Sequence, residues 1–249
     1  MPEGDTLART ADGLRPHLVG RAVTAVRGTT PGPRTDLIQG STVTAVETAG
    51  KNLLVRFSNG LELRTHLGLH GSWHRYRPGE RWRRPPARAR LVIEVPGAVA
   101  VCFDAPRVEL FEQRAEAVHP SLSRLGPDLL KPDVDLDEAL RRLRDPARAR
   151  RSVAEALMDQ RALAGIGNVV RNEALFLERV SPFIRVDDVD DETLRRLVER
   201  SRAILVSNAD RRRGPERVTT GGPRVAAGPL WVYGRGGRPC RRCGTLIRV

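Results

Sequence analysis

The hydrophobic pattern changes its period near residue 113, and this change constrains the fold more than any other feature of the chain. Between about residues 20 and 112, apolar and polar residues alternate in short stretches that are separated by Gly, Pro, Asn or Asp. Such alternation is typical of half-buried strands. Beyond residue 131, apolar residues recur at the three- and four-residue spacing of amphipathic helices. We therefore expect an α+β protein in which a strand-rich half precedes a helix-rich half.

Eight stretches of the first half have the strand pattern. They are RAVTAVRG, STVTAVETAG, NLLVRFSNG, LELRTHLG, SWHRYRP, ARLVIEVPG, AVAVCFD and RVELFE. Short strands at such regular spacing predict a β-sandwich or barrel, and Asn59-Gly60 predicts a hairpin turn. A helix with Asp5 as its N-cap is expected before them, because apolar residues recur at helical spacing. These residues are Leu7, Ala11, Leu14 and Leu18.

Four stretches of the second half predict helices, and a polar segment follows them. The helical stretches are VDLDEALRRLRD, RRSVAEALMDQ, NVVRNEALFLERV and DDETLRRLVERSRAILVSNA. Residues 208–229 are rich in Gly, Pro and Arg and predict a loop, and the last twenty residues predict one strand and a turn. The expected domains are a β-sandwich over 1–115, a linker over 116–131, a helical domain over 132–229 and a partial zinc finger over 230–249.

The formal charge of +13 and the pI near 11.2 indicate a polyanionic partner. Nucleic acid is the first choice and an anionic membrane surface the second. The chain has neither a run of eighteen apolar residues nor a secretory signal, so we expect a soluble, cytoplasmic protein without a membrane segment. Of the 43 Lys and Arg residues, only Lys51 and Lys131 are lysines. A retained lysine suggests a position where the proton must be released, which arginine cannot do.

Two cysteines near the end of the sequence form a Cys-x2-Cys pair, which is half of a tetrahedral zinc site. Only six residues follow Cys243, and nothing upstream of Cys240 is well placed to supply the missing ligands. Either the chain is a truncated form of a longer protein, which we favour, or the zinc knuckle is degenerate. The third cysteine, Cys102, has the pattern of a buried strand residue.

The stretch ALAGIGNVVRNEALF predicts a phosphate-binding turn. Gly165 and Gly167 allow a tight turn between two helices, and the positive field of the next helix start favours an anion. Asn168 can add a side-chain hydrogen bond. The alternative is a plain helix connector.

The start of the chain, MPEGD, can supply a reactive amine. A small second residue permits removal of methionine, which leaves Pro2 with a secondary α-amine whose ordinary pKa is about 7.7–8.0. Such an amine can attack C1′ of a deoxyribose and form an iminium ion. Glu3 can then act as general acid, and Lys51 in AGKNLL can shuttle protons. The alternative is that PEGD only starts a helix.

Together, PEGD, GKNLL, GIGN…NEALF and the terminal Cys-x2-Cys resemble the Fpg/Nei family of DNA glycosylases. The PEG start is more similar to the endonuclease VIII (Nei) branch, in an actinobacterial-like form. The resemblance covers the whole chain and implies a β-sandwich, a helix–two-turn–helix (H2TH) domain and a zinc finger that holds Zn2+. It also implies a monomeric base-excision-repair enzyme of the nucleoid, with DNA as its partner.

The resemblance assigns a role to each candidate residue. Pro2 becomes the nucleophile, Glu3 the acid, Lys51 a phosphate contact that assists elimination, and Asn168 a phosphate ligand. Leu69 and His70 of HLGLHG would fill the space that a flipped base vacates.

The implied activity is removal of oxidised pyrimidines followed by strand cleavage through β,δ-elimination. No residue corresponds to the phosphate-binding arginine of the family's finger. The alternatives are a non-catalytic binder of damaged or branched DNA on the same scaffold, and an RNA-binding protein.

Overall fold

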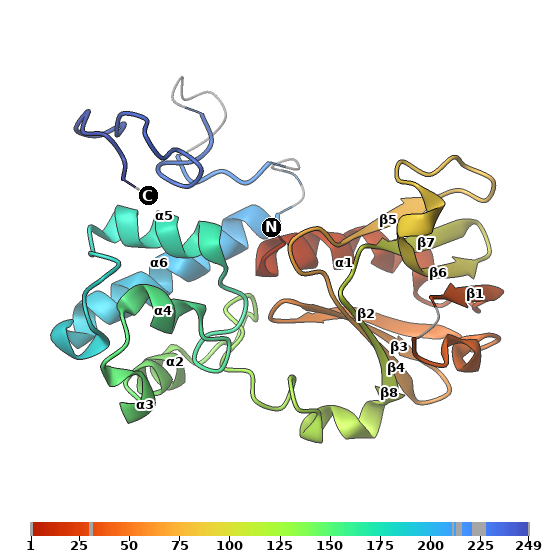
Figure 1. Ribbon diagram of the computed structural model, residues 1–249. Helices are drawn as coiled ribbons and strands as arrows, with labels where there is room; N and C mark the ends of the chain where they lie inside the picture. Colours follow the sequence, from red (N-terminus) through yellow and green to blue (C-terminus); the bar gives the residue numbers. More distant parts are fainter. Residues whose placement is uncertain (1, 30–31, 211, 213–215, 221–227, 249) are drawn as a thin grey trace. The chain divides into compact units, whose positions relative to one another are not determined.

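The computed structural model describes residues 2–29, 32–210, 212, 216–220 and 228–248. The chain forms two compact units that divide between Arg124 and Leu125 (Figure 1). The first unit is strand-rich and the second is helical, as the change of hydrophobic period predicts.

The first unit consists of one helix, α1 (Gly4–Leu18), and two antiparallel sheets of four strands each. One sheet has the order β1-β6-β7-β5 and the other the order β2-β3-β4-β8. The strands are β1 (Ala25–Gly28), β2 (Val43–Ala49), β3 (Asn52–Phe57), β4 (Leu61–His66), β5 (Ser72–Tyr76), β6 (Ala89–Val95), β7 (Ala98–Phe103) and β8 (Arg107–Glu112). All eight predicted strands are confirmed. Asn59 closes the β3–β4 hairpin, since its Oδ1 accepts a hydrogen bond from the Leu61 N–H at 3.2 Å.

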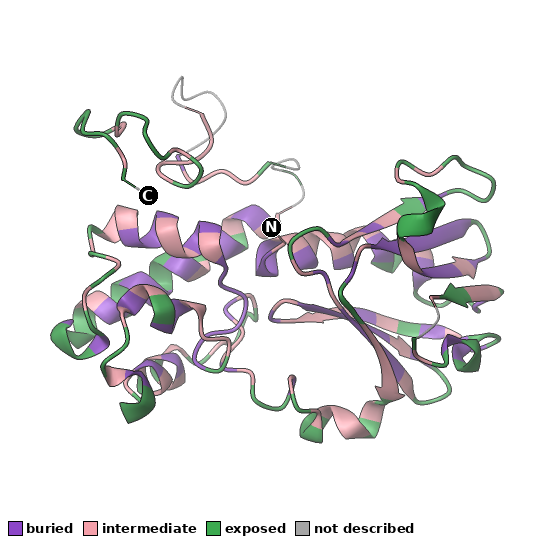
Figure 2. Ribbon diagram, viewed as in Figure 1, coloured by how far each residue is buried: buried purple, intermediate pink, exposed green. Residues whose placement is uncertain are grey.

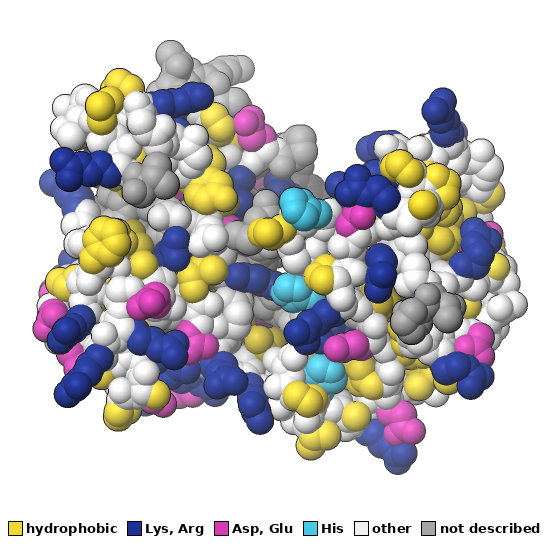
Figure 3. Space-filling model, viewed as in Figure 1, with side chains coloured by type: hydrophobic (Ala, Val, Ile, Leu, Met, Phe, Trp, Pro, Cys, Tyr) yellow, Lys and Arg dark blue, Asp and Glu magenta, His cyan; other side chains and the backbone are white. Residues whose placement is uncertain are grey.

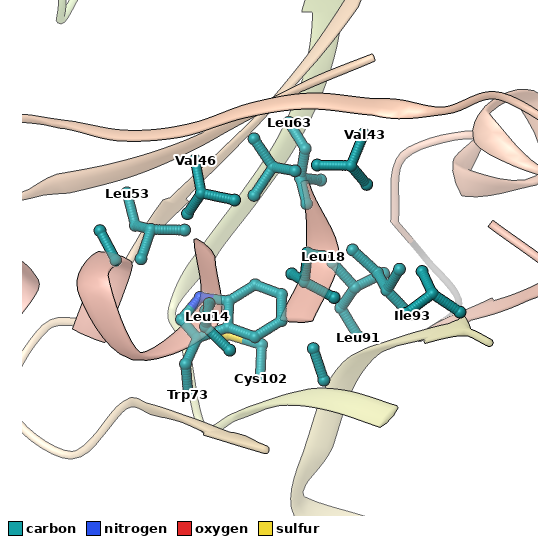
Figure 4. Packing of buried hydrophobic residues seen from close by; sticks show 14 of the residues in the cluster. Leu14, Leu18, Val43, Val46, Leu53, Leu63, Trp73, Leu91, Ile93 and Cys102 are labelled. Carbon is teal, nitrogen blue, oxygen red and sulfur yellow. The ribbon is translucent and has the colours of Figure 1, made fainter. Parts of the chain in front are cut away.

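The main core of this unit joins α1 to both sheets. Leu14 and Leu18 pack among side chains from the two sheets, including Val46, Leu63 and Leu91 (Figure 4). Complete burial of such a side chain contributes about 1.5–3 kcal/mol. Cys102 belongs to the same core, as predicted, and burial raises the pKa of its thiol.

A second, smaller cluster covers the opposite face of the β1-β6-β7-β5 sheet. Successive strand residues point to opposite faces, so Val92 and Val101 face away from the main core. The cluster also contains Tyr76 and Phe103, and Trp82 from the β5–β6 connection packs against it.

The predicted N-cap of α1 is wrong by two residues. Glu3 is the N-cap, with φ −123° and ψ −177°, and Asp5 lies in the first turn. The Glu3 carbonyl accepts from the N–H groups of Thr6 and Leu7 at 3.0 and 3.1 Å. The Asp5 side chain instead accepts from the backbone N–H of Thr6 at 2.6 Å.

The second unit contains five α-helices in its described part. They are α2 (Leu136–Leu143), α3 (Pro146–Ala149), α4 (Val153–Met158), α5 (Asn168–Glu178) and α6 (Asp191–Ala209). The four predicted helices are confirmed, and the one-turn helix α3 was not expected. Short 3-10 helices occur in both units. They are η1 (Thr35–Ile38), η2 (Pro86–Arg88), η3 (Gln113–Val118) and η4 (Val186–Asp188).

The C-terminal segment differs from its prediction. Residues 228–248 contain no regular strand, only an isolated antiparallel bridge between Pro239 and Leu246. Most of this segment is exposed or half-buried, whereas the helices and sheets have buried faces (Figure 2). The first two residues of the predicted loop 208–229 belong instead to α6, and residues 211, 213–215 and 221–227 lie outside the described residues. No described helix combines the length and apolarity needed to span a bilayer.

Candidate active site

The chain start places an acid in the core. Pro2 is half-buried, and Glu3 is fully buried at the N-cap of α1. Carboxyl groups are seldom fully buried, and Glu3 shares this property with Asp5, Glu62 and Glu173 among the described residues. Its position beside Pro2 distinguishes it from the other three.

Lys51 lies at the tip of the hairpin that joins β2 to β3. Ala49 pairs with Asn52, so Gly50 and Lys51 form a two-residue turn, which Gly50 permits with φ +57°. The side-chain Nδ2 of Asn52 donates to the Ala49 carbonyl at 2.8 Å and closes the turn.

The environment of Lys51 changes its acidity. Burial lowers the pKa of the Lys51 ammonium below its ordinary value, and the nearby charge of Glu3 partly offsets this effect. The structure therefore brings together Glu3 and Lys51, which are 48 positions apart in the sequence. It also gives the lysine a larger neutral fraction near neutral pH than an exposed lysine has.

Leu69 and His70 lie on the loop between β4 and β5, and both side chains are exposed; Leu69 is 62% exposed. An apolar side chain of this size at such exposure is available to enter another molecule. Gly68 shapes the loop with φ +57°, where an added Cβ would lie 2.9 Å from Cγ of Pro106.

The GIGN turn is held from inside the second unit. Gly165 has φ +102°, and its N–H donates to Gln160 Oε1 at 3.0 Å. Gln160 also donates to the Ile166 carbonyl at 3.0 Å. The Gly165 amide is therefore used within the protein, and the residue serves the shape of the turn. Gly167 is the N-cap of α5 and Asn168 is its first residue.

Sequence reasoning missed the basic side chains beside this turn. Arg161 and Arg171 line a hollow that also includes Gln160. Arg171 follows Asn168 by three positions on α5, so helical spacing could have identified it.

The cysteine pair does not fit a zinc ion by itself. The backbone N–H of Arg242 donates to Cys240 Sγ at 3.4 Å. Hydrogen bonds lower the pKa of the Cys243 thiol, with the larger effect from Thr245 and the smaller one from Cys240. Zinc sites of this type need four ligands. Among the residues that the structure describes, no His, Cys, Asp or Glu joins the pair to form a metal-binding group.

Glu173 on α5, also missed, holds the C-terminal segment. Its fully buried carboxylate accepts from the N–H groups of Trp231, Val232 and Tyr233 at 2.8–2.9 Å and from the hydroxyl of Thr219. The guanidinium of Arg242 lies over the rings of Phe176 and Trp231, 4.5 and 5.1 Å from their centroids. These contacts attach the segment to α5.

Both units match known protein families. Residues 1–109 match the formamidopyrimidine-DNA glycosylase N-terminal domain, and residues 125–215 match the formamidopyrimidine-DNA glycosylase H2TH domain. The fold, with its buried N-terminal glutamate, hairpin lysine and glycine turn, thus defines a DNA glycosylase of the H2TH class. The chain belongs to the formamidopyrimidine-DNA glycosylase/endonuclease VIII (Fpg/Nei) family.

Individual relatives agree with this assignment. The chain is 41% identical over 251 residues to endonuclease 8 2 of Mycobacterium tuberculosis, covering 99% of this chain and 93% of the relative. It is 38% identical over 250 residues to the DNA-(apurinic or apyrimidinic site) lyase Nei2 of Mycolicibacterium smegmatis, covering 100% and 93%.

Two solved structures are similar to the protein. The MutM (Fpg) protein of Thermus thermophilus has a TM-score of 0.79 and 29% identity, with 99% of this chain and 92% of that chain covered. A Lactococcus lactis Fpg in complex with DNA that contains N7-benzyl-Fapy-dG has a TM-score of 0.82 and 20% identity, with 99% and 93% covered. This second likeness supports the fold.

Proposed function

We propose that the protein is a bifunctional DNA glycosylase and AP lyase of base excision repair that removes oxidised pyrimidines. The observation that carries this proposal is the buried Glu3 next to Pro2 with Lys51 close by, in a chain whose residues 1–109 and 125–215 match this family. DNA is the partner, and the formal charge of +13 suits its phosphates.

The proposed reaction begins after Met1 is removed. The neutral Pro2 nitrogen attacks C1′ of the lesion deoxyribose, the N–C1′ bond forms, and the bond to the damaged base breaks. Glu3 supplies a proton to the sugar ring oxygen or to the leaving base. The Pro2 nitrogen then loses its proton, and the C1′–O4′ bond breaks with O4′ leaving as a hydroxyl group, so that the sugar opens to an iminium ion. This iminium ion makes the 2′ protons acidic. A base removes one of these protons, and the C3′–O bond breaks. A second elimination removes the 4′ proton, which the conjugated iminium makes acidic, and breaks the C5′–O bond.

The surrounding residues bind and orient the substrate in this proposal. Lys51 contacts a phosphate and assists elimination, and Asn168 at the start of α5 holds another phosphate. Leu69 and His70 enter the space left by the flipped base. Zinc belongs to a complete finger. The two cysteines present would hold it only with two further ligands, so no step depends on it.

Borohydride trapping tests the proposal. The full chain is mixed with an oligonucleotide that carries an abasic site, and borohydride reduces any imine to a stable covalent adduct. We expect an adduct with the wild type and a clearly lower yield with Pro2→Gly, because glycine replaces the secondary amine by a primary one. Equal trapping by the two proteins would contradict the mechanism. The alternative, a non-catalytic binder of damaged DNA, predicts a different result. The protein would bind the lesion tightly, form no adduct, and keep the same affinity in the variant Glu3→Gln.

A further inference from the structure

The connection between β5 and β6, residues 77–88, is the most arginine-rich loop of the first unit, and we call it the arginine loop. It carries five arginines and one acid, Glu80. The arginines are Arg77, Arg81, Arg83, Arg84 and Arg88. Arginine and lysine side chains are spread over the visible face of the protein (Figure 3), so a functional role for this loop needs more than charge.

The arginine loop is anchored to the sheet by aromatic contacts. Trp82 stacks on Tyr76, with ring centroids 6.1 Å apart, and meets Phe103 edge-on at 5.8 Å. The backbone N–H of Arg83 donates to the Tyr76 hydroxyl at 3.0 Å. One of the three tryptophans of the chain therefore holds this loop in place. An anchored loop loses less conformational entropy when it binds a partner.

The arginine loop is also tied to the loop that carries Leu69 and His70. Nη1 of Arg84 donates to the His70 carbonyl at 3.0 Å and to Asp104 Oδ2 at 2.7 Å. Arg88 donates to Asp104 Oδ1 at 2.8 Å. Asp104 has φ +52°, which is rare for a residue other than glycine and costs energy that its partners must offset. These hydrogen bonds therefore connect three loops of the unit: the arginine loop, the loop that carries His70, and the loop after β7 that carries Asp104.

The ion pairs separate the arginines into two groups. Asp104 balances Arg84 and Arg88. Arg77, Arg81 and Arg83 are exposed, and within the described ranges none of them forms an ion pair. Arg81 and Arg83 flank the anchored Trp82. Burial lowers the pKa of His74, and the charges of Arg84 and Arg83 lower it further, so their positive field reaches the adjacent strand.

We propose that Arg81 and Arg83 bind backbone phosphates of the DNA duplex next to the lesion. The inference rests on the proposed function in one respect. If the His70 side chain enters the DNA, the DNA must pass close to the arginine loop, because Arg84 of that loop is hydrogen-bonded to the His70 carbonyl. Guanidinium groups suit phosphate geometry because their N–H groups form a planar fork. Phosphate contacts position a duplex without reading its sequence, so this surface serves any lesion context.

The test measures how DNA affinity depends on salt. Each lost phosphate contact lowers the slope of log K against log salt by about 0.9. The double variant Arg81→Ala/Arg83→Ala, titrated as the full chain with a duplex that contains a stable abasic-site analogue, should show a slope lower by about 1–2. Both side chains are exposed, so the thermal midpoint should stay unchanged.

The matched control is Arg34→Ala/Arg114→Ala. It removes the same charge from exposed arginines of the same unit, which pair with Asp36 and Glu112. If the arginine-loop variant has the same slope as this control, the site does not exist and the loop is only a solvated basic surface.

Borohydride trapping separates this inference from the proposed function. A normal adduct with an unchanged slope overturns the phosphate site alone. Failure of the wild type to form any adduct overturns the proposed chemistry, whereas the slope difference between the two variants still decides whether the arginine loop binds DNA.

Discussion

Local backbone structure fixes the positions of Glu3 and Lys51. Glu3 is fixed by the start of α1, and Lys51 by a two-residue hairpin. Each residue is therefore held by backbone geometry, and a change in its side-chain chemistry should alter one step without loss of the fold.

Glu3→Gln should separate base removal from strand cleavage. The amide keeps the size of the side chain but cannot supply a proton, so we expect base excision to slow by about 10²–10⁴-fold. Processing of a preformed abasic site needs no departure of a base and should fall much less. Single-turnover rates on the two substrates check this, and an equal loss on both would contradict the role of Glu3.

Lys51→Arg should uncouple phosphate binding from proton transfer. Burial lowers the pKa of Lys51 below its ordinary value of 10.5, so the neutral form accumulates as pH rises through that lowered pKa. The elimination rate of the wild type should therefore rise with pH below 10.5. Arginine stays protonated, so the variant should bind DNA but lack this rise. A variant whose pH profile matches the wild type would exclude proton transfer by Lys51.

The elements differ in how far the sequence could predict them. Eight strands and four helices follow from the spacing of their apolar residues, although β1 and β8 contain no buried residue and β7 is buried along its whole length. The N-cap could not be assigned to Glu3 from this pattern, since Asp5 is the better capping residue and only the buried chain start displaces it. The one-turn helix α3 is too short to show a period.

The residues of the candidate site also differ in how far the sequence could predict them. Pro2, Glu3, Lys51 and Asn168 are identifiable from their motifs, and their roles remain predictions. Contacts across the chain were not predictable: Glu173 meets Trp231 58 positions away, and Arg84 meets the His70 carbonyl 14 positions away. Such pairings arise only when the elements pack.

Gly165→Ala should damage the H2TH turn without affecting the first unit. At φ +102° a Cβ is strained, with a cost of about 1–2 kcal/mol. The displaced turn should weaken DNA binding, while borohydride trapping at saturating protein keeps its yield. Gly60→Ala, also at positive φ but in the β3–β4 hairpin, is the control for strain alone. Equal loss of affinity in both variants would contradict a DNA contact at the turn.

At the scale of the whole molecule, the two units have separate cores, and the C-terminal segment is attached to the second unit through Glu173. The stability of this segment therefore depends on a buried carboxylate, and its two cysteines contribute no complete metal site in the described part of the chain.

Glu173→Gln should release this segment. The replacing amide has one accepting oxygen where the carboxylate has two, so buried N–H groups lose partners at a cost of about 1–3 kcal/mol each. The amides of Trp231, Val232 and Tyr233 should therefore exchange hydrogen much faster. Exchange in the first unit should not change. Glu192→Gln removes an exposed carboxylate on α6 and should leave the three amides protected. Unchanged protection in Glu173→Gln would show that the carboxylate does not hold the segment.

The central claim is that the Pro2 nitrogen forms the covalent bond, and mass spectrometry of the borohydride-trapped adduct tests it most directly. After proteolysis, the account predicts a peptide that begins at Pro2, lacks Met1 and carries the reduced sugar remnant on its terminal nitrogen. An adduct located on Lys51, or on a chain that retains Met1, would contradict it.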